Sequence, residues 1–245
     1  MITLFTDLDG TLLGGSEGDR QALLAADWRG RSGRLVYVTG RSLRLVLSLV
    51  SQGDIPIPDA IIGDVGTSIW SPAGRPLSEQ AHLEITKRWL PHGPSVKAEV
   101  AHLPGIKPQE EPRPRRQSFL YDEQALAANS LPEAVDRIES KGLDALVSGG
   151  CFLDALPRGI HKGWSVQWLM QHWGLRPEAV LVAGDSENDA SMLRLALPGV
   201  LVGNADAGLR RQAPATDHRV HAQAQGAAGI LEGLRTLQNR GVLLS

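Results

Sequence analysis

Two aspartates near the start of the chain have the types and spacing that phosphoryl chemistry requires. Asp7 and Asp9 directly follow the short apolar run 2–6 and precede Gly10. Two neighbouring carboxylates repel each other unless positive charge lies between them, and a divalent metal would leave one of them free to attack an electrophile. An aspartate that attacks phosphorus forms an aspartyl-phosphate. The alternative is a strand that ends in an Asx turn, in which both acids only accept backbone hydrogen bonds.

A second acidic cluster follows the apolar run 180–183. Its sequence is Gly184-Asp185-Ser186-Glu187-Asn188-Asp189. Carboxylate oxygens at the end of a strand suit Mg²⁺, which takes only a few carboxylates and keeps several waters. The alternative is a helix N-terminus at which acidic side chains interact favourably with the helix dipole. Taken alone, the cluster fits either a metal site or a helix start.

A hydroxyl and a lysine lie between these two clusters in the chain. Thr39 ends the apolar run 34–38 and precedes Gly40, so its hydroxyl and the neighbouring amides could hold a phosphate oxygen. The alternative for this turn is a helix start with Ser42 as N-cap. Lys162 could neutralise phosphoryl oxygens or extend into solvent. The order acid pair, hydroxyl, lysine, acid cluster is hard to explain as four unrelated helix caps.

The alternation of strands and helices predicts how these residues are positioned. Apolar, β-rich runs alternate with amphipathic helical patterns, which is typical of an α/β fold with a doubly wound, parallel, Rossmann-like sheet. In such a sheet ligands bind at the carboxyl ends of the strands, where the acids and Thr39 lie. We expect strands at 2–6, 34–38, 59–62, 117–121, 144–147, 180–183 and, with its turn, 199–205. We expect helices at 19–28, 42–52, 78–90, 131–141, 161–173 and 227–238, and a further helix that contains Met192 and Leu195.

The character of the sequence changes near residue 78. Prolines interrupt the chain repeatedly between 91 and 114, and the mixed charge run 110–116 is typical of a solvated loop. Strand and helix patterns resume between 117 and 156. We therefore expect residues 80–156 to form a small α/β domain that is inserted into a larger domain made of 1–79 and 157–245.

The composition is that of an ordinary globular protein. The 245 residues are 42% hydrophobic and 21% charged with a net charge of −2, so no global field would attract nucleic acid or an anionic membrane. The single cysteine, Cys151, excludes an internal disulfide and a thiolate zinc site. No apolar run approaches the ~18 residues of a membrane span, and the N-terminus reads as a strand instead of a signal peptide. We expect a cytoplasmic protein with no nucleic-acid or membrane partner.

The order and identity of the chemical residues resemble the haloacid dehalogenase superfamily of phosphohydrolases across essentially the whole chain. Asp7-Leu8-Asp9-Gly10-Thr11 is similar to its first motif, Thr39-Gly40 to its second, Lys162 to its third, and Gly184-Asp185 with Asp189 to its fourth. The resemblance implies a Mg²⁺ cofactor and an inserted α/β cap. It assigns attack on phosphorus to Asp7, acid–base chemistry to Asp9, and phosphoryl contacts to Thr39 and Lys162. The implied metal ligands are Asp7, Asp185, Asp189 and the backbone carbonyl of Asp9.

Within this superfamily the chain is most similar to sucrose-phosphate phosphatases. The similarity rests on the segments 66–70, 106–109, 111–119, 153–157 and 184–189. It implies contacts to the substrate from Gly40, Arg41, Thr67, Ser68, Lys107, Gln109, Arg116, Ser118 and Asn188. The sequence departs from that family at Cys151-Phe152, where polar residues are usual, and at His161, where asparagine is usual. Mannosylfructose phosphate and glucosylglycerol phosphate therefore stay open as substrates.

The leading hypothesis is a Mg²⁺-dependent phosphatase that converts sucrose 6-phosphate to sucrose and phosphate. The alternatives are a sugar phosphomutase, which passes the phosphoryl group to another sugar hydroxyl, and a non-catalytic sugar-binding module. The expected partner is a small sugar phosphate, and the sequence is compatible with a monomer. Trp164, Trp168 and Trp173 recur at helical spacing, which favours packing over stacking on a sugar ring.

Overall fold

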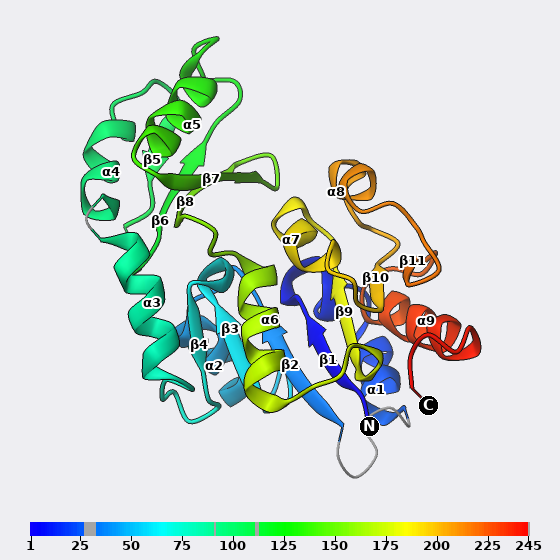
Figure 1. Cartoon of the computed structure of the whole chain (residues 1–245). Coiled ribbons are helices and arrows are strands. Elements are labelled where there is room, and N and C mark those ends of the chain that lie inside the picture. The colour runs from blue at the N-terminus through cyan, green and yellow to red at the C-terminus, as the bar shows by residue number, and fades with distance from the viewer. Residues whose placement is uncertain (27–32, 91, 111–112, 245) are drawn as a thin grey trace.

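The larger sheet of the protein forms the expected parallel core. The computed structural model describes residues 1–26, 33–90, 92–110 and 113–244. The strands of this sheet are β1 (Thr3–Thr6), β2 (Arg34–Val38), β3 (Ala60–Gly63), β4 (Ser68–Trp70), β9 (Val180–Gly184), β10 (Gly199–Leu201) and β11 (Arg219–His221). Their order is β11-β10-β9-β1-β2-β3-β4, and all neighbours are parallel except β3 and β4. The predicted doubly wound sheet is confirmed (Figure 1).

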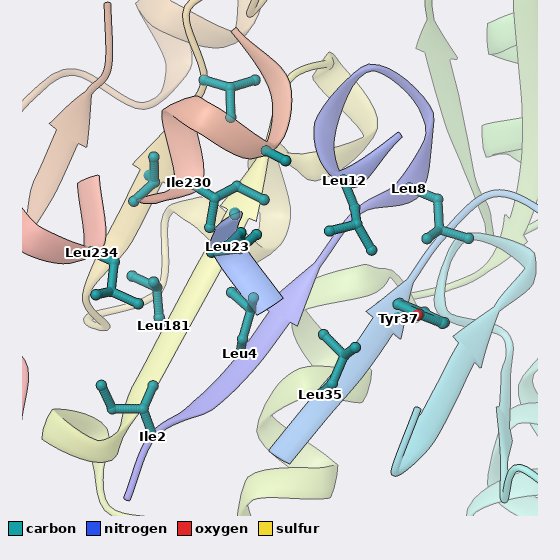
Figure 2. Close-up of a cluster of buried hydrophobic side chains, with 14 of the residues drawn as sticks. Ile2, Leu4, Leu8, Leu12, Leu23, Leu35, Tyr37, Leu181, Ile230 and Leu234 are labelled. Atoms are coloured by element: carbon teal, nitrogen blue, oxygen red, sulfur yellow. The ribbon is translucent and has the colours of Figure 1, made fainter. Parts of the chain in front are cut away.

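Strand β1 lies in the middle of this sheet because it is apolar on both faces. Ile2 and Leu4 belong to one buried cluster and Phe5 to the other, as the alternation of side chains along a strand requires. Figure 2 shows the first cluster, in which side chains from neighbouring strands pack against Leu23 and Ile230 of two helices. Burial of this apolar surface is the main term that favours folding, and it holds the residues after β1 at a rigid edge.

Helices cover both faces of the sheet (Figure 1). The cluster on one face contains residues of α1 (Glu17–Ala25), α2 (Leu43–Gln52) and α9 (Gly226–Asn239). The cluster on the other face contains residues of α6 (Lys162–Trp173), α7 (Ala190–Leu193) and α8 (Ala207–Gln212). All three tryptophans of α6 pack against this second cluster, which confirms their expected structural role. In the described part of the chain, no helix combines the length and hydropathy that crossing a bilayer requires.

A second, smaller unit is inserted between β4 and α6. It consists of β5 (Ile106–Pro108), β6 (Gln117–Tyr121), β7 (Leu143–Ser148), β8 (Phe152–Pro157), α4 (Gly93–Val100) and α5 (Ser130–Ser140). Its sheet is antiparallel in the order β5-β6-β8-β7. Helices α4 and α5 pack against one face of this sheet and leave the other face toward the core (Figure 1). The expected α/β cap is confirmed.

Helix α3 (Glu79–Trp89) joins the two units. Near its start Ala81 packs in a core cluster, and the Ile69 N–H donates a hydrogen bond to His82 Nε2 at 2.8 Å. Trp89, at its end, packs in the cap cluster. Because one helix belongs to both units, the domain limits at 79/80 and 156/157 stay predictions.

Several elements differ from the sequence prediction. The segments of α4, β5, α8 and β11 contain no strand or helix pattern that we could identify. Pro94 lies in the first turn of α4, where a missing N–H costs little, and Pro108 ends the edge strand β5. Helix α7 ends at Leu193, so Leu195 lies beyond it. Helix α1 begins earlier than predicted, and its predicted end at residue 28 lies outside the described residues.

The prediction that 110–116 is a solvated loop is wrong for Arg113 and Arg116, because their side chains are buried. The side chains of Arg113 and Arg116 are only 7% and 4% exposed. Both contact the core beside the carboxyl end of β2, so the charges are paired inside the protein instead of hydrated. Glu111 and Pro112 of the same run lie outside the described residues.

Candidate active site

Residues from three separate parts of the chain meet at the carboxyl end of the core sheet. Asp7 follows β1, Asp189 follows β9 and Lys162 begins α6. The Lys162 ammonium donates hydrogen bonds to Asp7 Oδ1 at 2.8 Å and to Asp189 Oδ1 at 2.6 Å. The lysine is fully buried, so neither solvent nor salt screens these contacts. The structure therefore places the first, third and fourth motifs in one cluster.

Two glycines allow the acidic segments to approach each other. Gly10 has a φ of +74°, and a Cβ at this position would lie 2.1 Å from Asp185 Oδ2. A Cβ on Gly184 would lie 2.5 Å from Asp189 Cγ. Thr11 Oγ1 donates a hydrogen bond to Asp185 Oδ1 at 2.8 Å. A side chain at either glycine would push the acids apart, which explains why these positions need glycine.

Backbone amides fix the orientation of Asp189. Its Oδ2 accepts hydrogen bonds from the N–H groups of Asp185 at 3.0 Å and Ser186 at 3.1 Å. These amides lie in the turn between β9 and α7, where N–H groups have no partner within the following helix. Oδ1 is left to face Lys162, so the carboxylate is held from both sides.

The acidic cluster carries more negative charge than Lys162 neutralises. Carboxylate oxygens of Asp7, Asp185 and Asp189 lie within 4.8 Å of one another. Burial raises the pKa of Asp7 well above its ordinary value despite Lys162, and burial together with Asp189 raises the pKa of Asp185 to about 7. Burial alone would lower the pKa of Lys162, but Asp189 and Asp7 outweigh it and raise that pKa. This buried, all-oxygen and under-neutralised set fits Mg²⁺.

The turn after β2 lies beside the acids. Thr39 is fully buried, and its Oγ1 accepts a hydrogen bond from the Arg41 N–H at 3.1 Å. The hydroxyl proton is therefore left to donate to another oxygen. The Arg41 guanidinium binds both carboxylate oxygens of Asp9, at 2.9 and 2.7 Å. The Asp9 side chain is 58% exposed and lies apart from the three-acid cluster, so it can reach a group that enters from solvent.

A cavity of about 510 Å³ lies between the acids and the cap. Asp7, Asp9 and Asp185 line its core side, and Phe152 and Asp154 line its cap side. Six of the predicted substrate contacts also line it: Gly40, Arg41, Gln109, Arg116, Ser118 and Asn188. The cavity therefore joins Asp7, Asp9 and Asp185 to most of the residues predicted to recognise substrate, whereas Thr39, Lys162 and Asp189 are fully buried and absent from its lining.

Three predicted substrate contacts do not reach this cavity. Thr67 Oγ1 donates to the Asp64 carbonyl oxygen at 3.0 Å, and Ser68 Oγ donates to Asp64 Oδ2 at 3.0 Å. Both residues are buried and absent from the cavity lining. Lys107 is exposed on β5 and is also absent from that lining. In this conformation the geometry gives these three residues a supporting or surface position, and it does not support direct contact with substrate.

A family model for sucrose-6F-phosphate phosphohydrolases matches residues 1–238 of the chain. The chain belongs to this family. The chain is 30% identical over 243 residues to the mannosylfructose-phosphate phosphatase of Agrobacterium fabrum, with 95% of each protein covered. It is 40% identical over 229 residues to the glucosylglycerol-phosphate synthase of Pseudomonas anguilliseptica, which covers 94% of this chain and 30% of that protein. The chain thus spans less than a third of the latter relative.

Solved structures agree with this assignment. The sucrose-phosphatase of Synechocystis, in complex with sucrose and phosphate, matches with a TM-score of 0.86 and 27% identity over 97% of this chain and 98% of that one. A haloacid dehalogenase subclass IIB sugar phosphatase shares the fold, with a TM-score of 0.64 and 19% identity over 99% of this chain and all of its own. The chain is therefore a phosphoric monoester hydrolase of the haloacid dehalogenase superfamily, and the predicted superfamily and enzyme class are both confirmed.

Sequence reasoning misses an ion-pair network in the cavity of the phosphohydrolase. Asp64 Oδ1 lies 2.5 Å from Arg113 Nη1, and Arg116 Nη1 lies 3.6 Å from Asp154 Oδ1. One available signal is that Asp64 directly follows β3, at the same edge of the sheet as the acids that follow β1 and β9. The two arginines carry no such signal, because their partners come from distant parts of the chain.

The departure at His161 has a structural explanation. His161 is the N-cap of α6, and its Nδ1 accepts a hydrogen bond from the Trp164 N–H at 3.0 Å. Asparagine is a preferred N-cap for the same reason, because its side-chain oxygen accepts from the first turn. Burial lowers the pKa of His161, which keeps the ring neutral and able to accept. The histidine thus positions Lys162 through the helix start, and it is absent from the described lining of the cavity.

The raised pKa of Asp185 predicts a pH-dependent response to Mg²⁺. The folded state binds the Asp185 proton more tightly than the unfolded state, so without metal this contribution to stability is present at pH 4 and is lost as the pH rises through about 7. Mg²⁺ competes with that proton. We expect Mg²⁺ to raise Tm by about 5 °C more at pH 8 than at pH 5, measured by thermal unfolding with and without chelator. The variant Asp185→Asn should lose the difference, and an equal shift at both pH values would contradict the assignment.

Proposed function

We propose that the chain hydrolyses a glycosyl phosphate through an aspartyl-phosphate on Asp7, with glucosylglycerol phosphate as its preferred substrate. The observation that supports this best is the position of Asp7, whose carboxylate lines the cavity and contacts the buried ammonium of Lys162. Lys162 holds Oδ1, and among the described residues no donor is found for Oδ2. Oδ2 is therefore the oxygen available to attack phosphorus.

Asp7 and Asp9 carry out the proposed bond changes. Asp7 attacks phosphorus, the bond between phosphorus and the sugar oxygen breaks, and Asp9, protonated and released from Arg41 for this step, gives its proton to that oxygen. Asp9 then takes a proton from the water that attacks the aspartyl-phosphate, which releases phosphate and restores Asp7. Thr39 Oγ1 and the third N–H of Lys162 donate to phosphoryl oxygens.

Mg²⁺ is the proposed cofactor of this reaction. Asp7, Asp185, Asp189 and the backbone carbonyl of Asp9 would hold it. When bound, it would neutralise charge on the phosphoryl oxygens, and it would compensate the excess negative charge of the buried acids.

The cap side of the cavity is partly apolar, which supports a substrate with fewer hydroxyl groups than a disaccharide phosphate. Phe152 and Gly149, from the turn between β7 and β8 and the start of β8, line this part of the cavity. Sucrose phosphate carries more hydroxyls than glucosylglycerol phosphate and would need more polar partners. Ser118 and Arg116 are already paired with Asp154, which leaves Ser148 and Gln109 as further polar lining residues on this side. The 40% identity with a protein named for making glucosylglycerol phosphate favours the same compound as substrate.

Sucrose 6-phosphate is the second candidate substrate. It is favoured by the family model, which covers residues 1–238, and by the sucrose bound in the Synechocystis structure. Measurement of phosphate release with Mg²⁺ should compare glucosylglycerol, sucrose and mannosylfructose phosphates. We expect kcat/KM for glucosylglycerol phosphate to be about tenfold above the others or more. A higher kcat/KM for sucrose 6-phosphate would make it the preferred substrate in place of glucosylglycerol phosphate. Phosphoryl label that stays on the sugar would indicate a phosphomutase. Sugar-phosphate binding without turnover would indicate a non-catalytic binding module.

Replacement of Phe152 by asparagine should shift selectivity toward the disaccharide. An amide at this position could hydrogen-bond a hydroxyl of the second sugar, so we expect the kcat/KM ratio of sucrose 6-phosphate to glucosylglycerol phosphate to rise about tenfold. The matched control is Leu120→Asn, because Leu120 pairs with Phe152 across the cap sheet and is similarly exposed, at 44% against 40%, but does not line the cavity. Equal ratios in Phe152→Asn and wild type would exclude Phe152 from substrate selection.

A further inference from the structure

The turn after β3 holds two residues in an unfavourable backbone conformation. Asp64 and Val65 have φ values of 52° and 57°, and among the described residues no other non-glycine has a positive φ. Aspartate tolerates this left-handed region, whereas a β-branched valine strongly disfavours it. Such conformations persist only where surrounding contacts impose them, and they occur frequently at functional sites.

This turn fixes the loop that would bind phosphate. The N–H of Val65 donates to the Thr39 carbonyl oxygen and the N–H of Asp64 donates to the Arg41 carbonyl oxygen, both at 3.0 Å. The Gly40 carbonyl oxygen between them accepts from Arg116 at 3.1 Å and from Arg113 at 3.4 Å. In a trans peptide the N–H points opposite to the C=O. With three successive carbonyls held in place, the N–H of Gly40 and the Thr39 hydroxyl are held in place as well.

The donors to Gly40 belong to the cap, and Asp64 holds them at the core. Asp64 Oδ1 contacts Arg113 Nη1 at 2.5 Å and lies 3.9 Å from Arg116 Nη2. The side chains of Asp64 and Arg113 are 10% and 7% exposed. Arg116 also contacts Asp154 of the cap sheet at 3.6 Å. Two acids and two arginines thus form a buried, charge-balanced network that connects the cap to the loop.

We propose that Asp64 is a positioning residue that couples cap docking to assembly of the phosphate-binding loop. With the cap docked, Asp64 places Arg113 and Arg116 on the Gly40 carbonyl, and the loop presents its donors to phosphate. Without the Asp64 charge the arginines lose their anchor, and the loop loses two of its supporting hydrogen bonds. This inference rests on the proposed function, because the inference requires that Thr39 and the adjacent Gly40 N–H bind phosphate.

Asp64→Asn tests the role of the charge. Asparagine tolerates the left-handed conformation and can still accept from Ser68, so the variant removes the charge and keeps the turn. Isothermal titration of the Mg²⁺-loaded protein with inorganic phosphate should show about tenfold weaker binding than wild type. Arg113→Gln should show the same loss and provides a second test should Asp64→Asn not fold. The double variant should bind no worse than either single variant, because both remove one interaction.

A surface ion pair of the cap provides the matched control. Glu110→Gln breaks the exposed contact between Glu110 and Lys97, 2.9 Å long, and should leave phosphate affinity unchanged. Phosphate affinity within twofold of wild type in both test variants, or additive losses in the double variant, would overturn the coupling. Phosphate binding needs no glycosyl substrate, so this result is separate from the turnover measurements that decide the proposed function.

Discussion

Asp7→Asn is expected to lower kcat for phosphate release by about 10⁴-fold or more. Removal of a nucleophile from a cooperating catalytic set costs losses of this order, because the remaining groups cannot form the covalent intermediate. The amide is nearly isosteric and can still accept from Lys162, so the geometry of the site is retained. KM should change much less than kcat, since the phosphoryl contacts from Thr39 and Lys162 remain. Steady-state phosphate release with Mg²⁺ measures both parameters.

The thermal stability of Asp7→Asn controls for loss of the fold. Asp7 is buried and its pKa is raised, so a neutral amide relieves repulsion from Asp185 and Asp189 and should maintain or raise Tm. A variant with unchanged Tm and lost turnover would assign chemistry to Asp7. Turnover within tenfold of wild type would show that another group attacks phosphorus.

Lys162→Met is expected to destabilise the protein by about 3–5 kcal/mol without metal at pH 8. Lys162 is fully buried and contacts two carboxylates, so its loss leaves Asp7 and Asp189 without a compensating cation. Methionine keeps most of the buried volume, which separates the effect of charge from the effect of a cavity. The loss should shrink as the pH falls, because the acids can then take up protons. Denaturant unfolding at pH 8 and pH 5 gives both values.

The double variant Lys162→Met/Asp189→Asn tests the electrostatic cause. Removal of one negative charge should restore about half or more of the lost stability, because the lysine and the acid interact directly. Mg²⁺ should also reduce the loss in Lys162→Met, since it supplies the missing positive charge. Identical losses in the single and double variants, with no effect of pH or Mg²⁺, would indicate a packing defect instead.

The catalytic set can be predicted from sequence because its members lie at the ends of elements that have clear periodicity. Asp7, Thr39 and Asp185 each follow a short apolar strand, and parallel strands bring their carboxyl ends to one edge. Lys162 begins an amphipathic helix that packs on the same sheet. The order of these elements is enough to bring the residues to one edge of the sheet, whereas their distances come from the structure.

The cap side of the cavity cannot be predicted in the same way. Arg113 and Arg116 belong to a charge run without periodicity, and their burial depends on Asp64 and the Gly40 carbonyl, which are distant from them in the chain. The exclusion of Thr67 and Ser68 from the cavity likewise follows from the left-handed turn at Asp64 and Val65. Local propensity argues against that turn, so only tertiary contacts explain it.

The proposed reaction depends on one covalent event, the transfer of the phosphoryl group to Asp7. Rapid-quench mixing of the Mg²⁺-loaded protein with a glycosyl phosphate labelled in its phosphoryl group tests it most directly. We predict label on the peptide that contains Asp7, formed before free phosphate, released by hydroxylamine as an acyl phosphate is, and absent in Asp7→Asn. Phosphate release in the first turnover with no protein-bound label, or label on any other residue, would contradict the account.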